Sequence, residues 1–274
     1  MGILKKLTEE YFGDTVREED FIDIHDLNVE IVSFTDNNDK FHKRGYKPED
    51  RDTLKELLER MIEVRGDEGN FNDIDTSDIK SMVSLFQFNS TFNGDITGWS
   101  VSKVTDMSGI FYCAKSFNQD ISKWEFPNLI NMSFMFSHAT SFNQDISKWK
   151  FPNVKYMGSM FYGAASFDQP IGNWKFPNVT DMNGMFYGAS SFNQPIGNWE
   201  FPNVENMRGM FSYATSFNQD ISKWKFPKVE NMNRMFSNAT SFNQDLSKWD
   251  LKGKKKTKIF YGCPIKKEYK PKMK

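Results

Sequence analysis

The sequence predicts an α/β solenoid: a stack of about seven coils of 25 residues, with one parallel sheet, short helical or 3₁₀ returns and a cap at each end. The main observation is the spacing of all seven tryptophans, which lie 25 residues apart at Trp99, Trp124, Trp149, Trp174, Trp199, Trp224 and Trp249. Phenylalanines at 86–236 and 92–242 and methionines at 82–232 keep the same step. Such a period is typical of a stacked array, in which neighbouring units complete one another's core, so these tryptophans are expected to be structural core residues.

The strand of each coil is predicted from the spacing of three apolar residues. Ile121, Trp124 and Phe126 are separated by three and then two residues, as in the strand segment of leucine-rich repeats. Side chains alternate along a strand, so Trp124 and Phe126 would share the inward face. Pro127 follows and lacks the N–H that a ladder needs, which marks the strand exit.

The return segment is predicted to be a short helix or 3₁₀ turn. Leu129, Met132, Met135 and Phe136 are spaced so that they fall on one helical face. Twelve of the 15 methionines lie in two repeat columns and are expected to fill the core. A row of asparagines and the glutamines beside it are expected to form ladders that satisfy turn backbone groups; the row comprises Asn93, Asn118, Asn143, Asn193, Asn218 and Asn243, with Asp168 in the remaining place.

The two ends differ from the repeats and divide the chain into four parts. Residues 1–46 form a small N-terminal segment or lobe, with helical character at 4–12 and a strand at 29–34. Residues 47–73 form a helical N-terminal cap, because Leu54, Leu57, Leu58, Met61 and Ile62 make one apolar stripe. Residues 74–250 are the repeat solenoid, and 251–274 are a C-terminal cap and Lys-rich tail. Residues 1–73 carry a net charge of −9 and residues 251–274 one of +9.

The repeat resembles a known family. The segment Trp99-Ser-Val-Ser-Lys-Val-Thr-Asp-Met-Ser-Gly-Ile-Phe and the recurring Ser-Phe-Asn-Gln-Asp-Ile-Ser-Lys-Trp are similar to the 25-residue repeat of the BspA-like leucine-rich-repeat proteins, often described as bacterial surface proteins. The resemblance covers about residues 74–263. It implies a right-handed solenoid with an interaction role and no catalytic residues. Five units depart from it by having Phe-Pro where the family commonly has Val-Ser.

The sequence offers no pattern for catalysis, a metal or a cofactor. His25, His42 and His138 form no ligand cluster, and Cys113 and Cys263 are too many coils apart for a disulfide. Phosphate-binding glycine motifs and nucleophile elbows are absent from the sequence. We therefore expect a protein that is not an enzyme and has no cofactor. Without an apolar run of about 18 to 20 residues or a signal peptide, the expected location is the cytoplasm.

The columns on either side of the tryptophans vary between units and are predicted to lie on the outer face of the sheet. They are the candidate partner-binding residues Lys123, Glu125, Lys148, Lys150, Asn173, Lys175, Asn198, Glu200, Lys223, Lys225 and Lys248. The two central units share Gln-Pro-Ile-Gly-Asn-Trp, whereas flanking units have Gln-Asp-Ile-Ser-Lys-Trp. Partner binding and duplication of one unit explain this pair equally well.

Three functions remain open. The first is a non-enzymatic module that binds a protein partner through the sheet face. The second is electrostatic binding of nucleic acid or an anionic surface by the Lys-rich end, which is disfavoured because Arg supplies only 7 of the 35 basic residues. The third is a surface adhesin, as the resemblance implies. We expect a monomer, with the opposite charges of the two ends favouring weak head-to-tail association at low salt.

Overall fold

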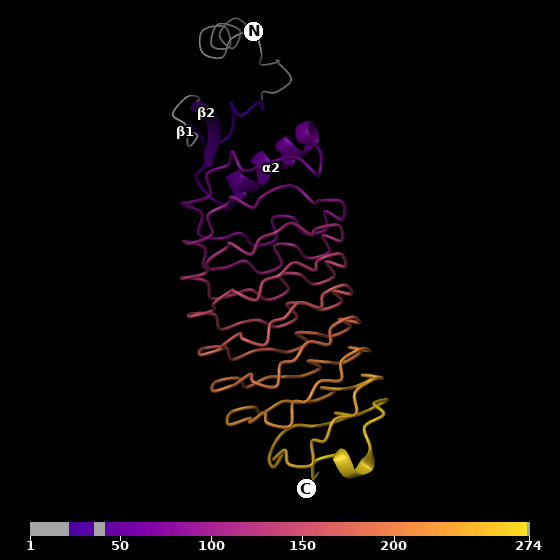
Figure 1. The fold of residues 1–274 in the computed structure, drawn as a ribbon. Coiled ribbons are helices and arrows are strands. Elements are labelled where there is room, and N and C mark those ends of the chain that lie inside the picture. The colour runs from indigo at the N-terminus through magenta and orange to yellow at the C-terminus, as the bar shows by residue number, and fades with distance from the viewer. Residues whose placement is uncertain (1–21, 36–41, 273–274) are drawn as a thin grey trace, which may run out of the picture.

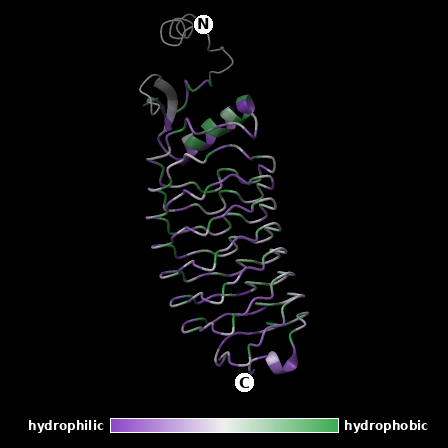
Figure 2. Ribbon diagram, viewed as in Figure 1, coloured by the Kyte–Doolittle hydropathy of each residue, from purple (hydrophilic) through white to green (hydrophobic). Residues whose placement is uncertain are grey.

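The computed structural model describes residues 22–35 and 42–272. This part of the chain winds through a series of coils stacked along one axis, with helix α2 at one end and the short helix η3 at the other (Figure 1). Hydrophobic and hydrophilic residues alternate along the coils (Figure 2). The right-handedness of the stack stays a prediction.

A hairpin precedes the stack. Strands β1 (Val29–Thr35) and β2 (His42–Pro48) pair antiparallel, and β1 covers the strand predicted at 29–34. The N–H of Tyr46 donates to the carbonyl of Asp73, and the N–H of Asp75 donates to the carbonyl of Tyr46, both at 2.8 Å. Strand β2 therefore joins the first coil directly and crosses the boundary expected between residues 46 and 47. The helical character predicted at 4–12 lies outside the described residues.

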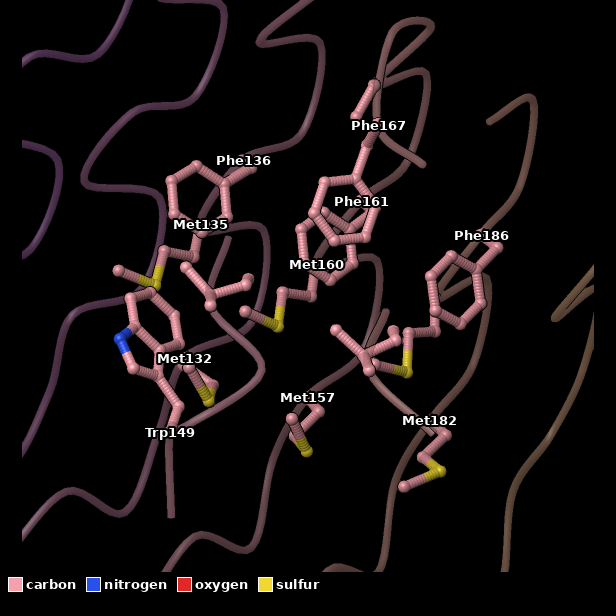
Figure 3. Packing of buried hydrophobic residues seen from close by; sticks show 14 of the residues in the cluster. Met132, Met135, Phe136, Trp149, Met157, Met160, Phe161, Phe167, Met182 and Phe186 are labelled. Atoms are coloured by element: carbon pink, nitrogen blue, oxygen red, sulfur yellow. The ribbon is translucent and has the colours of Figure 1, made fainter. Parts of the chain in front are cut away.

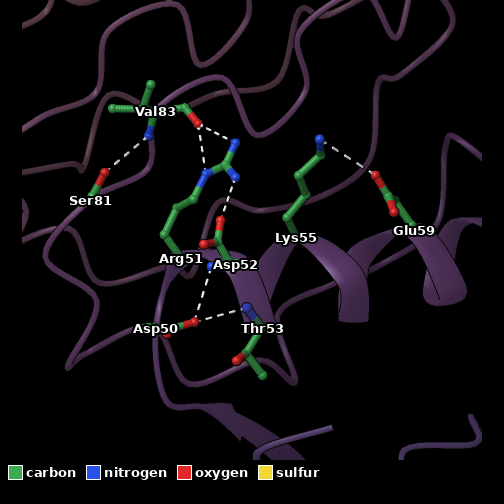
Figure 4. Close-up of polar contacts among 8 residues, drawn as sticks. All are labelled: Asp50, Arg51, Asp52, Thr53, Lys55, Glu59, Ser81 and Val83. Carbon is green, nitrogen blue, oxygen red and sulfur yellow. Dashed lines mark hydrogen bonds and ion pairs between the residues drawn. The ribbon is translucent and has the colours of Figure 1, made fainter. Parts of the chain in front are cut away.

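Helix α2 (Arg51–Arg65) covers the first coil. Asp50 caps its start, because one carboxylate oxygen accepts the backbone N–H groups of Asp52 and Thr53 (Figure 4). The predicted apolar stripe is buried at Leu54, Leu57, Leu58 and Met61, and Ile62 packs against the core. The guanidinium of Arg51 donates to the carbonyl of Val83 at 2.8 and 2.9 Å, which attaches the helix to the coil below it.

The pairing between coils differs from the predicted sheet. Within residues 74–250 the structure has isolated parallel bridges instead of extended strands, and in the repeats from Ser81 onward they lie one residue before the first methionine column, as in Asp106 with Asn131. The predicted strand segment folds into a turn, in which the N–H of Trp124 bonds to the carbonyl of Ile121 at 3.1 Å. That N–H is used within its own coil, and Pro127 has none, so the segment lacks the donors for a ladder.

The predicted helical return is a run of turns that also carries the pairing between coils. The N–H groups of Ile110 and Tyr112 close turns within the coil, whereas those of Gly109, Phe111 and Cys113 donate to carbonyls of the next coil at 2.8–3.0 Å. This alternation needs two residues with positive φ in each coil, Gly109 (φ 62) and Cys113 (φ 61) in this one. The backbone N–H groups of this run therefore alternate between acceptors in their own coil and acceptors in the next coil.

The core is a set of stacked columns. All seven tryptophans are buried, and so are the methionine and phenylalanine columns. Phe136, Phe161 and Phe186 follow one another along the stack with ring centroids 5.6 Å apart, beside Met135 and Met160 (Figure 3). Each of these rings also stacks on the phenylalanine six residues later, as Phe136 does on Phe142 with centroids 3.8 Å apart, so neighbouring columns pack on one another as well as along the stack.

The predicted asparagine ladder is confirmed. The Oδ1 atom of Asn118 accepts the backbone N–H of Asn143 at 2.9 Å, and the Nε2 atom of Gln144 donates to the carbonyl of Asn118 at 2.8 Å. Asp168 takes the same part, since its Oδ1 atom accepts the N–H of Asn193 at 2.8 Å. These side chains supply hydrogen bonds to turn backbone that has no partner in its own coil.

The C-terminal segment packs on the last coil. The Nζ atom of Lys254 donates to the carbonyls of Phe226 and Val229, both at 2.8 Å, and that of Lys256 donates to the carbonyl of Leu251 at 3.0 Å. Helix η3 (Lys267–Tyr269) follows the buried Ile265. Part of the lysine-rich segment therefore serves as hydrogen-bond donors to backbone and not only as surface charge.

Candidate interaction face

The eleven predicted partner-binding residues are all exposed. We call this surface the Trp-flanking face; it consists of Lys123, Glu125, Lys148, Lys150, Asn173, Lys175, Asn198, Glu200, Lys223, Lys225 and Lys248. Each coil presents one residue before and one after a buried tryptophan, because the turn at that position directs the indole inward. Within the described part of the chain, none of the charged members forms a salt bridge. Their charges are available to a partner.

Four members of the face surround one shallow hollow of about 720 Å³. Glu125, Lys148, Lys150 and Asn173 line it. Edges of Trp124, Phe126 and Trp149, with Ser147, Pro127 and Pro152, complete its lining. The other seven members are not part of this hollow and continue the face along the stack. The hollow combines an apolar floor with both signs of charge, which suits a protein side chain or a short peptide segment.

One polar atom near this hollow has no partner. The indole nitrogens of Trp149 and Trp174 donate to the carbonyls of Ile121 and Ile146 at 3.2 and 3.1 Å. The equivalent nitrogen of Trp124 is buried and has no hydrogen bond among the described residues. Its coil follows one with Val101 where later coils have phenylalanine, so the packing around this indole is different. Of the seven tryptophans, Trp124 is the one with an unpaired N–H.

The two central coils, which have Asn173 and Asn198 where flanking coils have lysine, also differ in their turns. In flanking units the Asp120 carboxylate accepts the backbone N–H of Ser122 at 3.0 Å, and hydrogen bonds from Ser122 lower the pKa of that carboxyl group. The central units have Pro170 in place of the aspartate and Gly172 in place of the serine. A Cβ atom on Gly172 would lie 2.4 Å from the carbonyl oxygen of Pro195, so this position requires glycine. Close approach between coils therefore accounts for Gly172. Partner binding and duplication of one unit both remain open as explanations of the shared Gln-Pro-Ile-Gly-Asn-Trp segment.

Three other properties of the described residues concern metal ligands, thiols and membrane spans. They contain no group of three His, Cys, Asp or Glu side chains placed to hold a metal ion. Cys113 and Cys263 are both free thiols. In the same part of the chain, no helix has the length and apolar character needed to cross a bilayer. What the face does supply is charge, amide groups and a partly apolar hollow.

Sequence reasoning missed a second surface on the run of turns. Aromatic side chains recur there in contact from coil to coil; we call them the aromatic row, which consists of Phe88, Tyr112, Phe134, His138, Tyr162, Tyr187 and Tyr213. The sequence signal for this surface is that residue size in two adjacent columns of the repeat varies in opposite directions. Where the first column has tyrosine the second has a small residue, as in Tyr162-Gly163, and where the first has serine the second can be aromatic, as in Ser212-Tyr213.

Comparison with known proteins gives one family. The sequence model of the family described as "Mycoplasma protein of unknown function, DUF285" matches residues 54–174 and again residues 157–270. The two matches together span the helix α2 region and the repeats, in agreement with a repeat protein. Searches of curated proteins and of solved structures give no match.

Proposed function

The chain belongs to the family described as Mycoplasma protein of unknown function, DUF285, and from this premise we propose that it is a non-enzymatic module that binds a protein partner through the Trp-flanking face. We further propose that the stack is a right-handed solenoid of the BspA-like leucine-rich-repeat type. The family description assigns no activity, so the proposal depends on the geometry of the face and on the resemblance of the repeat.

One observation carries the proposal: exposed charged and amide side chains recur at fixed positions on successive coils, and four of them surround one hollow. Lys148 and Lys150 lie on one side of a buried tryptophan layer, with Glu125 on the preceding coil. A rigid core beneath these side chains limits the entropy lost when a partner binds them. Extended faces of stacked repeats are used in this way by other repeat proteins.

The electrostatic alternative has less support. Lys254 and Lys256 donate to backbone carbonyls, which removes two of the ten lysines of residues 251–274 from the charge available to phosphate. Burial also lowers the pKa of Lys254. A surface adhesin uses the same face as the leading proposal and differs from it only in where the partner resides.

The test is site-specific photocrosslinking in extract and on intact cells of the source. The full chain carries the crosslinker at Asn173, beside the hollow, or at Lys115, an exposed control position among the turns on another side of the coil. We expect one discrete protein adduct from Asn173 that is lost in the double variant Lys148→Glu, Lys150→Glu. Equal adducts from both positions would contradict the proposal. Salt-sensitive binding of a labelled oligonucleotide would favour the electrostatic alternative.

A further inference from the structure

The aromatic row lies on a different side of the stack from the Trp-flanking face. The rings of Phe111 and Trp124 meet inside the core with centroids 6.2 Å apart. They come from backbone segments about half a coil apart, so their outward neighbours, Tyr112 and Glu125, are on opposite sides of that core. A ligand on the row would therefore not compete with one on the Trp-flanking face.

Four members of the row have positive φ, and two of these, Phe88 and Phe134, line one hollow. Phe88 has φ 63° and is 67% exposed, and Phe134 has φ 59° and is 47% exposed. A bulky residue is strained at positive φ. At the same two positions other coils have glycine, as at Gly163 and Gly184. Since these rings are strained and gain little from burial, stability of the fold does not explain them.

The same two rings line a shallow surface hollow of about 430 Å³. Ser84, Gln87, Phe88, Ser108, Gly109, Tyr112 and Phe134 line it. The ring planes of Phe88 and Tyr112 make an angle of 77°, and those of Tyr112 and Phe134 one of 87°. Neighbouring ring planes are therefore roughly perpendicular, with centroids 5.3 Å apart for Phe88 and Tyr112 and 6.4 Å apart for Tyr112 and Phe134. Gly109 leaves space between them because it has no side chain.

We propose that this hollow binds a proline-rich segment of a partner protein in the polyproline II conformation. A prolyl ring is compact and apolar and packs against aromatic side chains, as in the aromatic-lined grooves that bind such segments. Polyproline II backbone makes no internal hydrogen bonds, so its carbonyls are open to the Tyr112 hydroxyl, the Gln87 amide and the serine hydroxyls of the lining.

The spacing of the row agrees with this ligand. Phe88 and His138 occupy equivalent positions two coils apart, about 9.6 Å at the usual spacing of neighbouring strands. One turn of polyproline II advances about 9.3 Å. A segment lying along the stack axis would therefore present equivalent faces to Phe88 and to His138.

Other ligands fit the hollow less well. A quaternary ammonium ligand is favoured by negative charge, and the lining contains no carboxylate. Nor does it contain a cation to attract phosphate. A neutral peptide rich in proline matches the uncharged, partly aromatic lining.

The test is a titration of the full chain with a fluorescein-labelled oligoproline of about ten residues, long enough for about three turns. A glycine-serine peptide of equal length and a neutral glucan oligosaccharide are run beside it. The variants are Phe88→Gly and Phe134→Gly. The matched control is Tyr213→Gly, which removes another exposed aromatic residue at positive φ but lies outside the hollow. The melting temperature of every variant is measured as well. Glycine at these positions is expected to leave the melting temperature unchanged or to raise it.

We expect saturable binding of oligoproline by the wild type and by Tyr213→Gly, with affinity about tenfold weaker or worse in each phenylalanine variant, the size typical of losing an aromatic anchor. Absence of saturable oligoproline binding overturns the proposal, and so do equal losses in all three variants. Binding of the glucan in place of oligoproline would assign the hollow to carbohydrate instead. None of these results affects the Trp-flanking face, whose test uses other residues.

Discussion

The Oδ1 atom of Asn143 accepts a hydrogen bond from the backbone N–H of Asp168, one repeat later in the chain, at 2.9 Å. The Nε2 atom of Gln169 donates to both the carbonyl and the Oδ1 atom of Asn143, at 2.9 and 3.0 Å. One half-buried side chain thus fixes the position of the next coil. Because a repeat stack depends on contacts between neighbours, such a contact bears directly on stability.

Replacing Asn143 with alanine is expected to destabilise the protein by about 1–3 kcal/mol, because it leaves the N–H of Asp168 without its partner. Asn153→Ala is the matched control, since the Asn153 side chain bonds to the carbonyl of Pro127 but is exposed to water. Urea denaturation measures the free energy of unfolding of both variants. Equal shifts of the two midpoints would show that the ladder adds nothing to the surface bond.

Trp174→Ala is expected to cost about 3–5 kcal/mol, the range for truncating a large buried aromatic side chain. Trp174 is 1% exposed, stacks on Trp199 with centroids 6.4 Å apart and donates to the carbonyl of Ile146. Trp124→Ala should cost less, because the Trp124 indole has no hydrogen bond to lose among the described residues. Denaturation midpoints of the two variants test the order, and an unchanged curve for Trp174→Ala would contradict the packing.

Features that depend on repetition and apolar pattern were predictable from the sequence. The buried tryptophans are spaced by the period itself, and the stripe of Leu54, Leu57, Leu58 and Met61 specifies helix α2 by its own spacing. The asparagine ladder was predictable because a polar residue repeated beside a turn needs a partner in the next coil. The exposure of the Trp-flanking residues follows from the inward tryptophans beside them.

The details of the backbone were not predictable in the same way. Positive φ usually marks glycine, but here Cys113, Phe134 and His138 adopt it, so the sequence does not indicate the turns. The Ile-x-x-Trp-x-Phe spacing suits a strand, yet the turn at Ile121 and Trp124 uses the donor that a strand would need. The hollow of the Trp-flanking face joins residues of three repeats, from Trp124 to Asn173, and its shape depends on how the coils are offset.

Lys254→Ala is expected to destabilise the last coil by about 1–3 kcal/mol, because the carbonyls of Phe226 and Val229 lose their donor. Lys252→Ala removes an equal charge from an exposed side chain and should change stability by less than about 0.5 kcal/mol. Hydrogen exchange at the last coil distinguishes the two variants. Similar exchange rates in both would mean that charge, and not the carbonyl contacts, is what matters.

Head-to-tail association at low salt is best tested without shortening the chain, since Lys254 and Lys256 contact backbone carbonyls. The double variant Lys267→Glu, Lys270→Glu reverses two exposed charges and leaves those contacts intact. If the charged ends attract one another, wild-type sedimentation shows association at about 20 mM salt that disappears at about 300 mM and in the variant. A wild type that stays monomeric at low salt contradicts the association.

Asp78 links the N-terminal hairpin to the stack and makes stability depend on pH. Its carboxylate contacts the ammonium groups of Lys103 and of Lys47 in strand β2, the latter at 2.7 Å. The Lys103 hydrogen bond, followed by that from Lys47, lowers the pKa of Asp78 from 3.8 to about 2. Because the folded state binds this proton less readily, the contribution of Asp78 is fully present above about pH 4 and is lost as the pH falls toward about 2.

The expected result is a melting temperature of Asp78→Asn below that of the wild type near neutral pH, with the difference shrinking between about pH 4 and pH 2. Glu125→Gln is the control, since Glu125 is exposed and forms no salt bridge in the described part of the chain. Its melting temperature should follow the wild type across this range. A wild-type advantage over Asp78→Asn that persists unchanged near pH 2 would show that the pairs with Lys47 and Lys103 do not lower this pKa, since the charged carboxylate would then not be what stabilises the junction.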